Sequence, residues 1–79
     1  MSIEQEVKEL IAEHLGLALD QVQLQHSLSN DLGADSMDAV DLLLGLNEAF
    51  KLNMVFRELD QIETVAQLVD LVKSHLATG

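Results

Sequence analysis

The segment from Ser36 to Phe50 constrains the fold more than any other part of this chain. It contains no proline and consists mostly of good helix formers. Gly33 precedes it and suits the sharp end of a loop, because glycine reaches backbone conformations that are closed to other residues. Asp35 is a good N-cap, and Asp38 adds negative charge where the helix dipole favours it. These features predict a helix over residues 36–50 with a well-defined start.

This predicted helix has two apolar faces. At about 100° per residue, one side is broad enough to pack in a core and carries Ala39, Leu42, Leu43, Leu46 and Phe50. A different side carries a narrower apolar stripe edged with polar residues: Met37, Val40 and Leu44, beside Ser36, Asp41 and Glu48. A soluble helix normally needs one apolar stripe. The second stripe predicts either a docking surface for a partner with apolar and basic residues or a helix buried on nearly all sides.

The chain before this helix predicts another helix and a long connection. Ser2 and Gln5 form a capping box, and Gly16 is a candidate C-cap, so we expect a first helix between them. Residues 17–34 have poor periodicity, but apolar side chains are spaced through them: Leu17, Leu19, Val22, Leu24, Leu28 and Leu32. A long connection with regular apolar anchors is usually pinned across a core.

The chain after residue 50 predicts two more helices. Residues 56–60 suit a short helix of one or two turns. Thr64 and Gln67 form a second capping box, and helical spacing follows in Val65, Leu68, Val69 and Val72. We expect residues 75–79 to fray at the end of this last helix.

Length and charge narrow the classes of function. The 79 residues predict one domain over 1–79, with a core mostly of Leu, Val and Ile because only Phe50 and Phe56 are aromatic. The formal net charge of −10 argues against nucleic acid and against an anionic membrane surface. It favours basic protein partners, although solubility alone also explains it.

The composition also argues against disulfide-bonded, thiolate metal-binding, membrane-spanning and secreted proteins. The chain has no cysteine, so we expect neither disulfides nor thiolate metal sites. No hydrophobic run approaches membrane-spanning length, and the N-terminus begins an acidic helix pattern instead of a basic signal peptide. We therefore expect a cytoplasmic protein.

Ser36 is the most interesting candidate for chemistry. A serine hydrolase is improbable, because His14, His26 and His75 stand in no catalytic motif and the sequence G-A-D-S-M is not a nucleophile elbow. Residues 31–35 lack the calcium-loop pattern, so no metal site is predicted. Since Asp35 already serves as the cap, however, the Ser36 hydroxyl is left free for modification by another enzyme.

Three stretches closely resemble acyl carrier proteins: L-G-A-D-S-M-D at 32–38, D-A-V-D-L at 38–42, and L-D-Q-I-E-T-V-A-Q-L-V-D-L-V at 59–72. The resemblance extends over essentially the whole chain. It implies an all-α four-helix bundle, with three main helices, a short third helix and a long loop between the first two.

The resemblance also implies a function. Ser36 would carry a 4′-phosphopantetheine arm, transferred from coenzyme A by a phosphopantetheinyl transferase, and the thiol of the arm would hold acyl groups as thioesters. The chain would have no catalytic residue. It would act as a monomer that presents its cargo to enzymes of fatty acid, polyketide or related lipid biosynthesis.

The family pattern also assigns two sets of residues. The first set would dock basic and apolar patches of partner enzymes: Asp35, Met37, Asp38, Val40, Asp41, Leu44 and Glu48. The second set would line a cavity that shelters the acyl chain, although plain core packing explains it too: Leu42, Leu46, Phe50, Leu59 and Val65.

The chain departs from many fatty-acid carriers near the predicted third helix. Where these often have an acidic segment with I-P-D, residues 51–57 contain two bases and no proline, and Asn47 stands where Glu is common. These departures predict a less acidic, more apolar docking surface, and either a specialised carrier or a divergent fatty-acid carrier. The alternatives are a carrier of aminoacyl or hydroxyacyl groups and an acidic helical adaptor without a prosthetic group.

Overall fold

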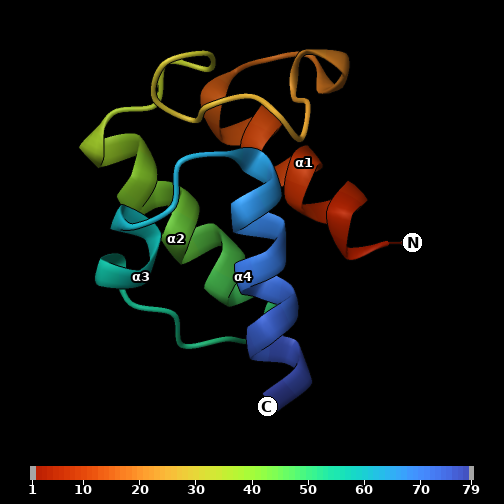
Figure 1. Ribbon diagram of the computed structural model, residues 1–79, viewed down its shortest axis with the longest axis vertical. Helices are drawn as coiled ribbons and strands as arrows, with labels where there is room; N and C mark the ends of the chain where they lie inside the picture. The colour runs from red at the N-terminus through yellow and green to blue at the C-terminus, as the bar shows by residue number, and fades with distance from the viewer. Residues whose placement is uncertain (1, 79) are drawn as a thin grey trace.

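Helices make up most of the described residues, 2–78, of the computed structural model (Figure 1). The elements in chain order are α1 (Ile3–Leu15), the 3-10 helix η1 (Leu19–Gln21), α2 (Ser36–Phe50), α3 (Phe56–Asp60) and α4 (Val65–Thr78). No strand occurs within these residues, where a single isolated β-bridge joins Ser27 to Thr64. The predicted all-α fold, with three main helices and a short third one, is confirmed.

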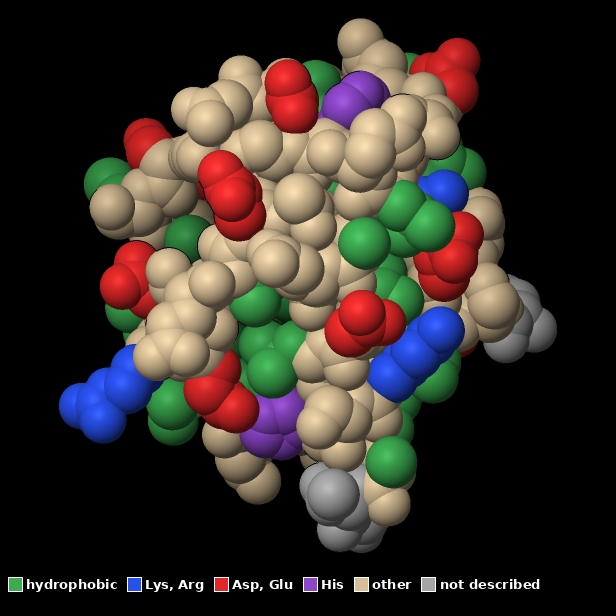
Figure 2. All heavy atoms as spheres, viewed as in Figure 1, with side chains coloured by type: hydrophobic (Ala, Val, Ile, Leu, Met, Phe, Trp, Pro, Cys, Tyr) green, Lys and Arg blue, Asp and Glu red, His purple; other side chains and the backbone are tan. Residues whose placement is uncertain are grey.

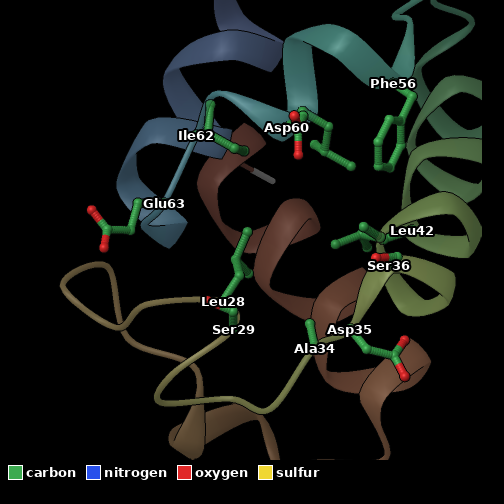
Figure 3. Close-up of a pocket in the computed structure, with 12 residues that line it drawn as sticks. Leu28, Ser29, Ala34, Asp35, Ser36, Leu42, Phe56, Asp60, Ile62 and Glu63 are labelled. Atoms are coloured by element: carbon green, nitrogen blue, oxygen red, sulfur yellow. The ribbon is translucent and has the colours of Figure 1, made fainter.

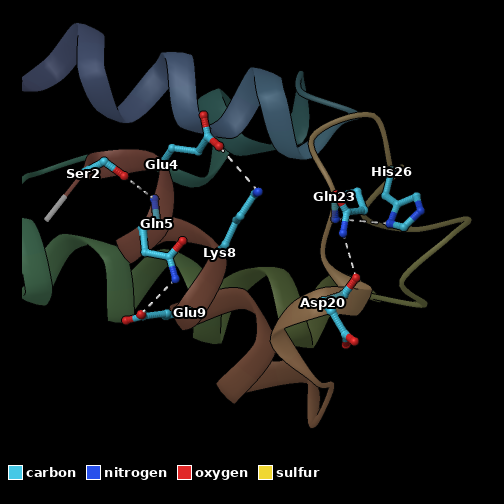
Figure 4. Close-up of polar contacts among 8 residues, drawn as sticks. All are labelled: Ser2, Glu4, Gln5, Lys8, Glu9, Asp20, Gln23 and His26. Atoms are coloured by element: carbon cyan, nitrogen blue, oxygen red, sulfur yellow. Dashed lines mark hydrogen bonds and ion pairs between the residues drawn. The ribbon is translucent and has the colours of Figure 1, made fainter.

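Local capping explains where α1 begins and ends. The Ser2 hydroxyl accepts a hydrogen bond from the Gln5 backbone N–H at 3.0 Å (Figure 4). The Gln5 side chain, however, donates to Glu9 at 3.2 Å, so the expected capping box forms only in part. Gly16 adopts φ 69°, ψ 36° at the other end, a left-handed conformation that costs glycine nothing.

The core lies between α1, α2 and α4, as the ribbon arrangement shows (Figure 1). It consists mainly of aliphatic side chains: Val7, Ile11, Ala12, Val22, Leu42, Leu43, Leu46, Met54, Leu59, Val65, Leu68, Val69 and Val72. The broad face of α2 therefore packs inward. Its narrow stripe stays outside, since Met37 is 77% exposed and Leu44 is 61% exposed. The alternative of a helix buried on nearly all sides is wrong.

The long connection between α1 and α2 is pinned across the core, as predicted, and the structure adds that it is bonded to the start of α4. Val22 is fully buried, and Leu28 packs against the core. The backbone N–H of Leu28 donates to the Glu63 carbonyl at 2.9 Å, and the Val65 N–H donates to the His26 carbonyl at 3.0 Å. Leu19 is the exception among the expected anchors, because it is 39% exposed.

The helix α4 continues to Thr78, and Gly79 lies outside the described residues, so fraying of residues 75–79 stays a prediction. A contact joins the last turns of α4 to α3, where His75 Nε2 lies 2.7 Å from Glu58 Oε1. The capping box at the start of α4 forms as predicted, with Thr64 and Gln67 bonded reciprocally at 3.0 and 3.2 Å.

Candidate functional site

Ser36 is the first residue of α2, and the residues around it fix the start of that helix. The Asp35 carboxylate accepts from the Asp38 backbone N–H at 2.9 Å, and the Asp38 carboxylate accepts from the Asp35 N–H at 3.2 Å. The loop before them turns at Gly33, which has φ 75°. This reciprocal capping box fixes the backbone of Ser36 and Met37, which lie between its two members.

The Ser36 side chain is exposed, and its hydroxyl makes no hydrogen bond within residues 2–78. The three histidines are engaged elsewhere. The ring of His14 faces Gly45, where a Cβ atom would lie 2.6 Å from its Nε2, His26 bonds within its own turn, and His75 bonds Glu58. Ser36 therefore has an accessible hydroxyl without a histidine base, which suits an acceptor and not a nucleophilic catalyst.

A pocket of about 370 Å³ opens beside Ser36, between the first loop, the start of α2 and α3 (Figure 3). Most of its lining residues are apolar, and three are acidic: Leu28, Ser29, Ala34, Asp35, Ser36, Ala39, Leu42, Phe56, Leu59, Asp60, Ile62 and Glu63. Ser36 thus lies where a group attached to its oxygen has an apolar recess within reach.

The pocket only partly matches the cavity expected from the sequence. Leu42 and Leu59 line it, but Leu46, Phe50 and Val65 do not. Leu46 and Val65 are fully buried in the core behind it, and Phe50 lies at the far end of α2. Their role in sheltering an acyl chain stays a prediction, because a residue on the core face of a helix can pack tightly without bordering open space in the unloaded chain.

The residues expected to dock partner enzymes share the outer side of α2. Met37, Val40 and Leu44 are all exposed, and so are the side chains of three acids beside them: Asp35, Asp41 and Glu48. Two acids at the helix start use their carboxylates in the capping box, the exposed Asp35 and the half-buried Asp38, whereas those of Asp41 and Glu48 take no part in it. The structure thus brings an apolar stripe and free carboxylates onto one surface.

Asn47 has a role that the sequence did not reveal. Its side-chain amide makes two hydrogen bonds with the backbone of Met54. Nδ2 donates to the Met54 carbonyl, and the Met54 N–H donates to Oδ1, both at 2.9 Å. The side chain is half-buried and bonded to the α2–α3 connection. Asn47 is therefore an anchor for this connection. The expectation of a less acidic docking surface in this region stays a prediction.

Replacing Asn47 with Ala is expected to lower the free energy of unfolding by about 1–3 kcal/mol, because it leaves both polar groups of a buried backbone unit without a partner. Urea denaturation followed by circular dichroism measures the change. The exposed Asn53 in the same connection provides the control, and Asn53→Ala is expected to cost much less. Equal losses in the two variants would refute the anchoring role.

Glu58 joins the start of α3 to the last turns of α4. Its carboxylate accepts from the Val55 backbone N–H at 3.0 Å and lies 2.7 Å from His75 Nε2. The hydrogen bond from Val55 lowers the pKa of this carboxyl below its ordinary value, and the hydrogen bond from His75 lowers this pKa further. The short helix α3 is thereby tied at its first turn.

The lowered pKa of Glu58 predicts a specific pH dependence. A carboxyl whose pKa is lower in the folded than in the unfolded state stabilises the fold above its unfolded pKa, and this contribution is lost as pH falls through the folded pKa. The melting temperature of wild type should therefore exceed that of Glu58→Gln at neutral pH. The difference should shrink as pH falls below the ordinary value of 4.5. A difference that stays constant down to about pH 3 would contradict the prediction.

Residues 2–78 contain neither a cluster of metal ligands nor a membrane-spanning helix. No group of three or more His, Asp or Glu side chains there is arranged to hold a metal ion. None of the described helices combines the length and apolarity that crossing a bilayer requires.

Comparisons with known proteins give consistent matches. A family model described as the phosphopantetheine attachment site matches residues 5–72. An acyl carrier protein from Enterococcus faecalis is 32% identical at a TM-score of 0.75, and the match covers 92% of each chain. An acyl carrier protein from Thermotoga maritima is 29% identical at a TM-score of 0.78, covering 92% of this chain and 85% of that one.

A third solved structure is the apo doublet acyl carrier protein from prodigiosin biosynthesis. It is 26% identical at a TM-score of 0.78, and the match covers 91% of this chain. The present chain spans only 35% of that longer one.

Proposed function

Because this chain belongs to the acyl carrier protein family and carries acyl groups on 4′-phosphopantetheine, we propose that Ser36 is the residue to which this arm is attached. The observation that carries the proposal is the free, exposed Ser36 hydroxyl beside the pocket. The matched family segment includes this position. The N-terminus of α2 also favours the negative charge of a phosphodiester.

The residues around Ser36 fit such an arm. The capping box between Asp35 and Asp38 holds the helix start without using the Ser36 oxygen, and the adjoining recess has an apolar interior. When bound, the arm supplies a terminal thiol that holds the acyl group as a thioester. The chain itself orients the attachment point and offers a surface to partners.

We infer that the chain does no catalysis of its own. No histidine is placed to activate Ser36 within the described residues, so the phosphopantetheinyl transferase must supply the base for attachment. The enzymes that build and modify the acyl group supply the later chemistry. Action as a monomer in the cytoplasm, with neither nucleic acid nor membrane as partner, stays a prediction.

Intact mass spectrometry tests the attachment directly. The protein is incubated with coenzyme A, magnesium and a broad-specificity phosphopantetheinyl transferase. The expected result is a mass increase of one phosphopantetheine per chain. A well-folded protein that gains no mass would instead support the alternative of an acidic adaptor.

We further propose that the outer side of α2 binds the basic and apolar patches of partner enzymes. The exposed stripe of Met37, Val40 and Leu44 offers apolar area, and the free carboxylates beside it offer opposite charge to Lys and Arg. Figure 2 shows carboxylates spread over the viewed face, with few basic side chains among them. Such a surface speeds the encounter with a basic partner, most strongly at low salt.

Asp41 is the best position to test this docking surface, because its exposed carboxylate takes no part in capping. Asp41→Lys is expected to slow modification by the transferase about three- to tenfold at low salt, and less at high salt. Asp70→Lys makes the same charge change on an exposed position of α4 and is expected to leave the rate nearly unchanged. Equal rates for the two variants would count against docking on α2.

The pathway that this carrier serves is also a matter for proposal. The pocket lining near Ser36 is largely apolar, which favours an aliphatic acyl group over an aminoacyl group. We propose that this pocket shelters the cargo of a fatty acid, polyketide or related lipid pathway.

A further inference from the structure

We propose that the ring of Phe56 covers the α3 side of the pocket beside Ser36 and thereby shelters the cargo, and that this pocket takes short, uncharged acyl chains. This inference rests on the proposed attachment at Ser36. It names the cargo class and the residue that covers it.

The first step is that Phe56 lies at the edge of the pocket. It is the first residue of α3, it lines the pocket, and it is 39% exposed. Figure 3 shows its ring pointing from α3 toward Leu42 and Ser36 across the recess. An apolar ring that remains partly in water at the edge of a recess gains by covering an apolar chain beneath it.

The second step is that the backbone around Phe56 is held on both sides. Asn47 clasps Met54, two residues before it. Glu58, two residues after it, bonds both Val55 and His75. A helix as short as α3 has little stability of its own, so these anchors keep the ring at the pocket.

The third step concerns depth. Leu42 and Leu59 line the pocket but are only 2% and 5% exposed, and the residues Leu46 and Val65 behind them are fully buried. At roughly 30 Å³ for each water-sized group, the 370 Å³ of the pocket accommodate a chain of several carbons and part of the arm. A long chain would have to open the core.

The fourth step concerns charge. Asp60 is the acidic residue on the α3 side of the pocket, the carboxylates of Asp35 and Glu63 point away from the recess (Figure 3), and no Lys or Arg lies among the lining residues. A cargo that itself ends in a carboxylate would meet like charge at the rim and lose its hydration inside. The pocket therefore favours an uncharged acyl group.

The test compares thioester protection among variants loaded with a defined cargo. Wild type, Phe56→Ala, Phe56→Leu and Val55→Ala are each loaded with hexanoyl-phosphopantetheine from hexanoyl-coenzyme A by a broad-specificity transferase. Val55 is the matched control, because it is adjacent and 56% exposed but does not line the pocket. Intact mass confirms loading first, so a failure of the proposed attachment is seen separately.

Hydroxylamine then removes the acyl group as a hydroxamate and leaves the free thiol, and mass spectrometry follows the rate. Because only the unsheltered thioester reacts, we expect removal to be about threefold or more faster from Phe56→Ala than from wild type. Val55→Ala should match wild type, and Phe56→Leu should fall between the two. The same proteins loaded with succinyl groups should all react at one rate.

Three results would overturn the proposal. These are equal rates for hexanoyl-loaded wild type and Phe56→Ala, equal acceleration by Val55→Ala, and equal protection of the succinyl cargo. Thermal melting establishes that each variant is folded. If Phe56→Ala is not folded, the test is whether hydroxylamine removes the hexanoyl group faster from Phe56→Leu than from wild type.

Discussion

Ser36→Ala is expected to abolish phosphopantetheine transfer completely while the protein remains folded. The substitution removes the oxygen that would accept the phosphoryl group. Because this hydroxyl makes no hydrogen bond within residues 2–78 and is exposed, its loss should change the free energy of unfolding by less than about 0.5 kcal/mol. Intact mass after transferase treatment and urea denaturation measure the two effects on the same sample.

Ser29→Ala is the matched control for this experiment. Ser29 is also exposed and lines the same pocket, but it lies in the first loop and not at the start of α2. Its removal is expected to leave the mass increase intact. A mass increase on Ser36→Ala, or its loss in Ser29→Ala, would place the attachment elsewhere.

The Ser36→Ala variant also separates the alternatives in function. An adaptor that only binds proteins through the outer side of α2 would keep its function without Ser36, whereas a carrier would lose it. Release of product from a generic ester by wild type, abolished in Ser36→Ala, would instead support a hydrolase.

Leu46→Ala is expected to lower the free energy of unfolding by about 2–5 kcal/mol. Leu46 is fully buried on the core face of α2, so truncation loses burial and leaves a cavity that close neighbours fill only partly. Domains of this size have total stabilities of only about 5–15 kcal/mol, so the effect should be plain in urea denaturation at constant m-value.

Leu44→Ala makes the same chemical change two residues away, where the side chain is 61% exposed. It is expected to cost less than about 0.5 kcal/mol. Similar losses at the two positions would mean that the faces of α2 are assigned wrongly. Loading by the transferase should respond in the opposite sense, with Leu44→Ala slowed and folded Leu46→Ala little affected.

The sequence was sufficient for the features that depend on neighbours along the chain. Helix spacing and caps predicted α1, α2 and the start of α4, and 100° periodicity separated the broad core face of α2 from its narrow stripe, whose exposure the structure then decided. The free hydroxyl of Ser36 was predicted by the same kind of local reasoning, because Asp35 caps the helix. All of these depend on contacts within about one helical turn, which sequence spacing specifies directly.

Only the tertiary structure decided which distant groups meet. The bonds of Asn47 to Met54 and of Glu58 to His75 join residues 7 and 17 positions apart. The pocket excludes Leu46 and Val65 but includes Phe56 and Ile62, because recessed space depends on how α3 and the first loop lie against α2. Periodicity indicates which face of a helix turns inward, whereas the packing of separate elements determines where that face leaves room.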